Sequence, residues 1–140
     1  MPMRKEPTVR SGWVWRASVR VALSLLCAGF FHAGWLVVFL LTIEVDHSLV
    51  QALRWLLAPV VTATGFATGI VIWERFTRAS RAGFLRVLPW PLIGCALGAG
   101  AVYWVGPMLI GFGIFAAGTA SVVIREVYYQ RQTAVSSKKG

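Results

Sequence analysis

The sequence predicts an all-α integral membrane protein, a four-helix bundle made of two transmembrane hairpins. The chain of 140 residues is 57% hydrophobic, which is too apolar for a single water-soluble domain. Its fourteen Lys and Arg residues fall into three clusters, with Arg54 alone outside them, and long uncharged stretches separate the clusters. A helix needs about 20 apolar residues to cross the hydrocarbon layer. The uncharged stretches are long enough to supply such helices.

The N-terminal half contains a basic segment and two predicted spans. In residues 1–20, Trp13 and Trp15 lie among arginines, which predicts a short helix on the cytoplasmic surface of the membrane. Residues 21–43 form the first predicted span and residues 55–73 the second. The loop between them is predicted to lie outside the cell.

The C-terminal half contains a second predicted hairpin. The uncharged run 87–124 is too long for one crossing and contains Gly106-Pro107, a pair that favours a turn. It therefore predicts two spans, residues 87–105 and 108–124, joined by that turn. Residues 125–140 form a predicted cytoplasmic tail, and we expect its last residues, near 136–140, to be disordered.

The basic clusters orient these spans. Lys and Arg are retained on the cytoplasmic side of a membrane, and four crossings place all three clusters on one side. Both termini are therefore predicted in the cytoplasm, in a bacterial inner membrane. Basic residues beside spans also meet anionic lipid headgroups, which accounts for the net charge of +9 without a nucleic-acid partner. The predicted headgroup contacts are Arg16, Arg20, Arg75, Arg78, Arg81 and Arg86.

Glycines spaced for close helix packing recur in three of the spans. Small residues let helix backbones approach one another in lipid, where no hydrophobic effect drives association. The pattern predicts contacts within the bundle and leaves open that some faces dock against other membrane proteins. The predicted packing residues are Gly65, Gly69, Gly94, Gly98, Gly111, Gly113 and Gly118.

The predicted spans contain no Asp, Glu, Lys or Arg, which argues against an ion-coupled transporter and most enzyme classes. We therefore expect no catalytic residues and no metal site. The exception is His32 at the midpoint of the first span, where an imidazole is costly without a partner. One interpretation is a neutral histidine hydrogen-bonded to a threonine or carbonyl of a neighbouring helix. The others are a polar contact with another subunit and an axial ligand of haem or bacteriochlorophyll, since Ala28-Gly29-Phe30-Phe31-His32 resembles the Ala-x-x-x-His motif of bacterial light-harvesting polypeptides.

Several elements of the second hairpin occur together in one known family. They are Trp90-Pro91-Leu92, Tyr103-Trp104, Gly106-Pro107 and Glu126-Val127-Tyr128-Tyr129. Over residues 90–129 the chain resembles the small four-helix subunit IV of bacterial, actinobacterial-type cytochrome c oxidases. The resemblance implies an accessory subunit of a haem-copper oxidase with no redox centre of its own. The first hairpin shows no clear match, and residues 74–86 are short and basic where that family has a longer acidic connector.

These observations predict a non-catalytic accessory subunit of a bioenergetic membrane complex, either a respiratory oxidase or a photosynthetic complex. Its expected partners are other integral membrane subunits and anionic lipids. Two alternatives stay open. One is a small homo-oligomeric channel or carrier lined by Thr62, Thr64, Thr68 and His32. The other is a subunit that binds haem or bacteriochlorophyll through His32.

Overall fold

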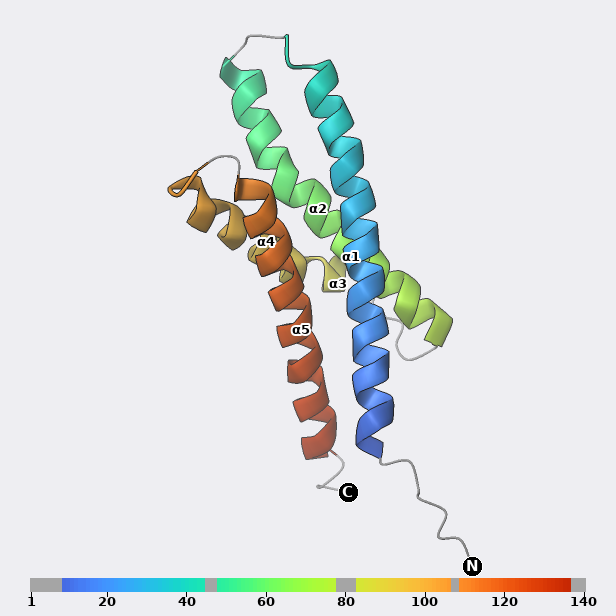
Figure 1. Ribbon diagram of the computed structural model, residues 1–140. Helices are drawn as coiled ribbons and strands as arrows, with labels where there is room; N and C mark the ends of the chain where they lie inside the picture. The colour runs from blue at the N-terminus through green and yellow to red at the C-terminus, as the bar shows by residue number, and fades with distance from the viewer. Residues whose placement is uncertain (1–8, 45–47, 78–82, 107–108, 137–140) are drawn as a thin grey trace, which may run out of the picture.

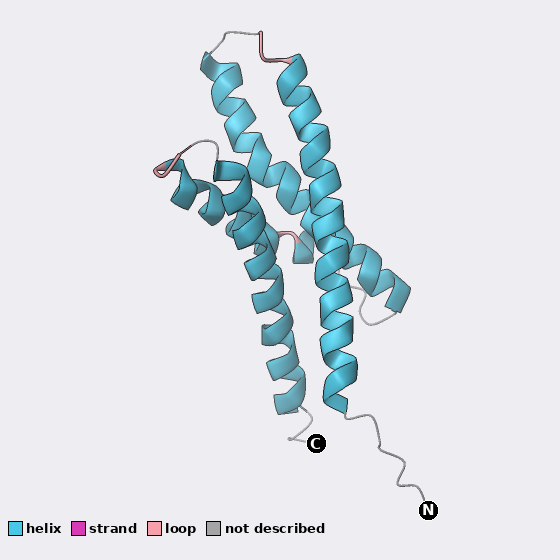
Figure 2. Cartoon of the chain, in the orientation of Figure 1, coloured by secondary structure: helices cyan, strands magenta, loops and turns pink. Residues whose placement is uncertain are grey.

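The chain folds into helices joined by short turns. The computed structural model describes residues 9–44, 48–77, 83–106 and 109–136, and these residues contain no β-strand (Figure 2). The all-α prediction is therefore confirmed. The helices in chain order are α1 (Val9–Leu41), α2 (Ser48–Thr77), α3 (Phe84–Val87), α4 (Pro89–Tyr103) and α5 (Ile110–Ser136).

Two antiparallel hairpins make up the molecule, one from α1 and α2 and the other from α4 and α5 (Figure 1). The α2 helix contacts every other helix, and α5 also packs against α1. The beginning of α1 and the end of α5 lie at the same end of the molecule, and the α4–α5 turn stops short of the α1–α2 turn (Figure 1). We call the end that holds the start of α1 and the end of α5 the terminal end, and the opposite end the hairpin end.

Within the described residues, three helices are long and apolar enough to cross a membrane. They are Gly12–Leu41 within α1, Ser48–Thr77, which is all of α2, and Ile110–Gln132 within α5. The third predicted span, residues 87–105, begins at the last residue of α3, a helix of 4 residues, and otherwise coincides with α4, which has 15. Since a helix rises about 1.5 Å per residue, α4 covers about 22 Å of a hydrocarbon layer about 30 Å thick. A fourth crossing is therefore not shown by length and composition.

Two prolines explain why the helix is broken at the start of the third predicted span. Proline has no N–H to donate and clashes with the preceding turn, so it is best tolerated in the first turn of a helix. Pro89 and Pro91 therefore occupy the first turn of α4, while α3 ends at Val87. The turn after α4 lies where Gly106 predicts it, with the Leu109 N–H donating to the Gly106 carbonyl at 3.0 Å. Pro107 lies outside the described residues.

The N-terminal segment differs from the prediction of a separate surface helix. The α1 helix runs without a break for 33 residues, from Val9 to Leu41, and includes Trp13 and Trp15. No proline interrupts this stretch, so nothing in the local sequence ends the helix at residue 20. At about 50 Å it is longer than the hydrocarbon layer, and one end must extend beyond it. The α5 helix likewise continues past residue 124, and residues 137–140 of the predicted tail lie outside the described residues.

Glycines allow close helix contacts within each hairpin. A Cβ atom added to Gly65 of α2 would lie 2.6 Å from the Cα atom of Ala28 of α1, and one added to Gly69 would meet Ser24. A Cβ atom added to Gly94 of α4 would lie 2.6 Å from the carbonyl oxygen of Ala117 of α5. Only glycine allows backbones to approach this closely.

Three further predicted packing glycines lie at contacts within the second hairpin or between the two hairpins. Gly98 of α4 and Gly113 of α5 face each other, and Gly118 lies against Phe66 of α2 and Cys95 of α4. The core around these contacts consists mainly of buried Ala28, Phe66, Ile70, Ile114 and Val122. Six of the seven predicted packing glycines therefore lie at helix contacts within this chain. Gly111 is the exception.

Candidate functional site: buried ion pairs and a histidine cavity

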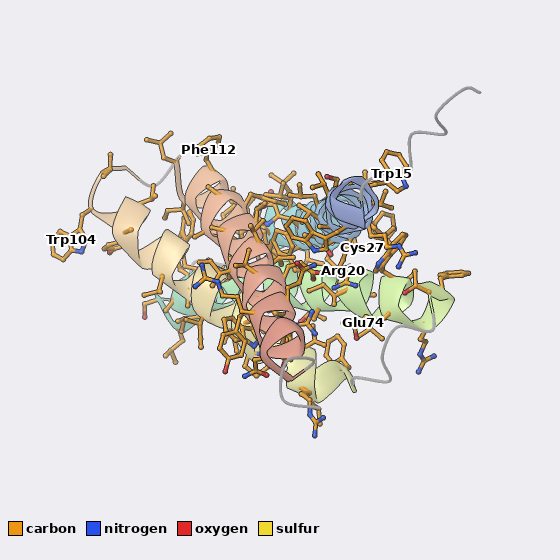
Figure 3. The ribbon with its side chains drawn as sticks, turned by 90° about the horizontal axis from the view of Figure 1, so that it is seen from below. Trp15, Arg20, Cys27, Glu74, Trp104 and Phe112 are labelled. Atoms are coloured by element: carbon orange, nitrogen blue, oxygen red, sulfur yellow. The ribbon has the colours of Figure 1, made fainter. Side chains whose placement is uncertain are left out.

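Two ion pairs hold three helices together at the terminal end. Arg20 of α1 pairs with Glu126 of α5, and Arg125 of α5 donates a hydrogen bond of 3.1 Å to Glu74 of α2. The side chains of Glu74 and Arg125 are each 6% exposed, and those of Arg20 and Glu126 are 15% and 13% exposed. Figure 3 views the molecule from this end and labels Arg20, near α1 and α5, and Glu74, on α2.

Three charged residues just outside the predicted spans are buried within the described part of the protein. Glu74 and Arg125 are buried inside α2 and α5, and Arg54 is buried near the start of α2. The guanidinium of Arg54 lies over the ring of Phe39, 5.6 Å from its centroid. Arg54 and Glu74 are twenty residues apart, which is about 30 Å along a helix and matches the thickness of the hydrocarbon layer. The helices therefore extend past the predicted span limits, and charge lies at both ends of α2.

The basic residues predicted to meet lipid headgroups divide into two groups. Arg16, Arg75 and Arg86 are exposed, as a headgroup contact requires. Arg20 differs, because its side chain is largely buried and paired with Glu126. An ion pair between helices replaces the lipid contact predicted for it. Arg78 and Arg81 lie outside the described residues.

His32 is half-buried between α1, α2 and α5. Its Nδ1 atom lies 2.8 Å from the hydroxyl oxygen of Thr62, which places a hydrogen bond between α1 and α2. Its ring meets Phe115 edge-on at 5.1 Å and Trp35 at 5.3 Å between centroids. The hydrogen bond to a threonine of a neighbouring helix agrees with the first of the three interpretations of this residue.

The Thr62 hydroxyl lies 2.8 Å from both the Ala58 carbonyl oxygen and Nδ1 of His32. A hydroxyl has one proton to donate, so the tautomer of His32 depends on which of these two acceptors receives it. When Thr62 donates to Ala58, it accepts from a protonated Nδ1. A charged ring is costly in apolar surroundings, and in this neutral tautomer Nε2 is an acceptor with a free lone pair.

A cavity of about 290 Å³ lies beside His32, between α1, α2 and the first residues of α5. Its walls include Trp35, Phe39 and Trp55. Gly111 also lines it, and a Cβ atom on this glycine would meet only Nε2 of His32, at 3.8 Å. Gly111 was predicted to pack helices, and among the described residues it makes no close backbone contact of the kind made by the other six glycines. The missing side chain leaves space in front of the histidine instead.

The space before Nε2 does not fit the macrocycle of haem or bacteriochlorophyll. Axial ligation places a wide flat ring directly in front of the coordinating nitrogen. The backbone of α5 at Gly111 lies close to that region, because a Cβ atom added to Gly111 would be 3.8 Å from Nε2. The volume of about 290 Å³ is also at the lower limit of small-molecule sites, which span about 300–1,000 Å³. The residues present suit a smaller ligand.

The threonines predicted to line a pore turn their hydroxyls to their own helix. Thr62, Thr64 and Thr68 each donate to the carbonyl four residues earlier, at 2.8, 2.9 and 2.8 Å. Such local bonds satisfy a hydroxyl without water. The arrangement gives no support to a channel lined by these side chains.

The ion pairs at the terminal end were not predicted from the sequence, although the positions of two acidic residues indicate them. The chain has only five acidic residues, and Glu74 and Glu126 both lie inside basic clusters. Each stands next to an arginine and at the end of an apolar stretch, where a lone carboxylate is disfavoured. Acidic residues in such positions favour a partner on another helix.

The fold and these sites define an all-helical protein of the membrane-spanning type, held together by interhelical ion pairs. Comparisons with models of known protein families, with curated proteins and with solved structures find no match for the chain. Its function is therefore inferred from its own residues.

Proposed function

We propose that this chain is a non-catalytic accessory subunit of a larger bioenergetic complex in the bacterial inner membrane, with both termini in the cytoplasm. The orientation rests on the basic clusters, which the positive-inside rule places in the cytoplasm. A respiratory oxidase fits the resemblance of residues 90–129 to oxidase subunit IV. The partners would be other integral membrane subunits, and anionic lipids would meet the exposed arginines.

The observation that carries this proposal is the short second hairpin. The α4 helix covers about 22 Å, and its last residue, Tyr103, is 67% exposed, while Trp104 and Val105 in the turn after it are 90% and 74% exposed. Figure 3 shows Trp104 extending from the edge of the molecule. Non-helical backbone within the hydrocarbon layer is tolerated only where protein covers it or water reaches it. A neighbouring subunit packed against this turn would provide that cover.

The outer face of α4 suits such a neighbour. Ala96, Gly100 and Ala101 are exposed, and a Cβ atom on Gly100 would meet nothing within 4 Å. Small residues on an open face let a second helix approach closely. This face is distinct from the one that Gly94 and Gly98 use against α5.

The test is purification of the tagged protein from its native membrane in mild detergent, followed by mass spectrometry of what accompanies it. We expect larger membrane subunits in a fixed ratio to the tagged chain. Gly100→Leu should reduce their recovery at least fivefold, because the larger side chain blocks the open face of α4. Gly34→Leu is the matched control, since Gly34 of α1 also has nothing within 4 Å. Recovery should then stay as in the unmodified protein.

Two results would contradict the proposal. Equal recovery of partners with Gly100→Leu and Gly34→Leu would remove the α4 face as the docking surface. A defined homo-oligomer without other subunits, conducting solute in liposomes, would favour the channel instead.

A further inference from the structure

The cavity beside His32 has the features of a small-ligand site. Nε2 of His32 faces a space otherwise lined by aromatic and aliphatic residues. Among the residues that the structure describes, none donates a hydrogen bond to Nε2. An acceptor with no donor in apolar surroundings costs free energy, which a ligand hydroxyl can recover.

The size of the cavity limits the ligand to about one ring. About 290 Å³ equals roughly ten water molecules at about 30 Å³ each. Trp35 and Phe39 of α1 lie in one wall, with their ring centroids 5.3 Å apart, and Phe39 meets Trp55 of α2 at 5.9 Å. Aromatic side chains at such distances favour a further aromatic ring through offset or edge contacts.

The position of the cavity indicates that its ligand comes from the lipid. Leu36 and Trp55 line it and are 43% and 39% exposed, so it opens on the outer surface of the α1–α2 hairpin. That surface belongs to two of the helices long and apolar enough to cross a membrane. A ligand that enters there must be soluble in lipid.

We propose that this cavity binds the ring of a lipid-soluble phenol or quinol, whose hydroxyl donates a hydrogen bond to Nε2 of His32. Thr62 positions the acceptor by holding the proton on Nδ1. Gly111 provides the space for the ligand hydroxyl, and Trp35 and Phe39 contact its ring. Binding involves no covalent or redox step. The site does not depend on the proposed role as a subunit, and either can fail without the other.

The test uses the full chain in lipid nanodiscs with trimethylhydroquinone as the quinol and its dimethyl ether as the matched ligand without a donor. Affinity is measured by equilibrium dialysis, and ¹⁵N-histidine labelling follows the Nε2 signal of His32. We expect saturable binding of the quinol and a shift of that signal. The ether should bind about three- to tenfold more weakly, the range expected for one neutral hydrogen bond. Phenol itself would show whether one hydroxyl suffices.

Variants locate the site. Gly111→Leu fills the space before Nε2 and should weaken quinol binding at least tenfold, whereas Gly34→Leu, in open space, should leave it unchanged. His32→Phe keeps an aromatic ring but no acceptor, and should make the quinol and its ether bind equally. If this variant does not fold, comparing the quinol and its ether on the unmodified protein still tests whether a ligand hydroxyl donates to Nε2.

Three results would overturn the inference. They are equal affinity of the unmodified protein for quinol and ether, quinol binding to Gly111→Leu as tight as to the unmodified protein, and no saturable binding. The last result would indicate that only water contacts Nε2.

Discussion

The two ends of the interface between α1, α2 and α5 satisfy their polar side chains differently. At the terminal end, four charged side chains from three helices pair with one another and are largely buried. Towards the hairpin end, His32 makes one hydrogen bond to Thr62 and turns its other nitrogen to a cavity. The terminal end is closed by its own charges. The histidine end presents an acceptor that another molecule can use.

The two ends therefore have different roles: the ion pairs stabilise the fold, and the His32 cavity can exchange a ligand. A buried ion pair cannot open without exposing charges to an apolar medium, so the terminal end resists separation of the helices. The His32 cavity can gain or lose a small molecule while the hydrogen bond to Thr62 stays in place. Close backbone contacts at Gly65 and Gly69 lie between the two ends and keep α1 against α2. We expect mutations at the terminal end to change folding and those near His32 to change binding.

The largest effect should follow from breaking the Glu74–Arg125 pair. Arg125→Leu leaves the Glu74 carboxylate buried without this partner, and the free energy of unfolding should fall by about 3–5 kcal/mol. Quinol binding to the variant fraction that remains folded should be unchanged. Equilibrium unfolding in mixed micelles, followed by circular dichroism, measures the effect.

The double variant Glu74→Leu with Arg125→Leu is the control for this prediction. Removing both charges leaves neither member of this pair buried without the other, and apolar replacements of buried pairs are often neutral. The double variant should therefore recover most of the stability lost in Arg125→Leu. A double variant as unstable as the sum of two single variants would show that the pair has no such coupling.

A smaller effect should follow from adding a methyl group at Gly65, in the close contact between α1 and α2. The Cβ atom of Gly65→Ala would lie 2.6 Å from the Cα atom of Ala28, so α1 and α2 must separate. Overpacking of this kind costs about 1–3 kcal/mol. Gly34→Ala meets nothing within 4 Å and should be neutral, or stabilising by up to about 1 kcal/mol. Thermal unfolding of both variants tests the difference, and equal midpoints would argue against a tight contact.

The regular features of the fold follow from the sequence because they depend on local pattern. Long uncharged apolar stretches form the middle of α1 and α2, and Gly106 marks the turn between α4 and α5. The break between α3 and α4 at Leu88 also has a local cause. Pro89 and Pro91 favour the first turn of a helix, so a new helix begins there. The predicted span 87–105 runs across this break, because hydropathy alone does not register it.

The sites depend on packing, and the sequence predicts them only in part. A hydrogen bond from His32 to a threonine was expected from the cost of an unpaired imidazole, but the sequence left its partner open. The role of Gly111 as a cavity wall depends on where α5 begins relative to α1, a relation between residues far apart in the chain. The pairing of Arg20 with Glu126 likewise needs α1 and α5 side by side.

The smallest effect on stability, and the most informative for the histidine end, should come from Thr62→Val. The variant keeps the shape of the side chain and removes the acceptor of Nδ1, which should cost about 0.6 kcal/mol, the average for such bonds in a membrane protein. The proton of His32 is then free to move to Nε2, so the ¹⁵N signals should show a second tautomer and quinol binding should weaken. Thr64→Val is the matched control, because the Thr64 hydroxyl bonds only to the Val60 carbonyl of its own helix. If the two variants leave the same histidine spectrum and the same affinity, Thr62 does not orient His32.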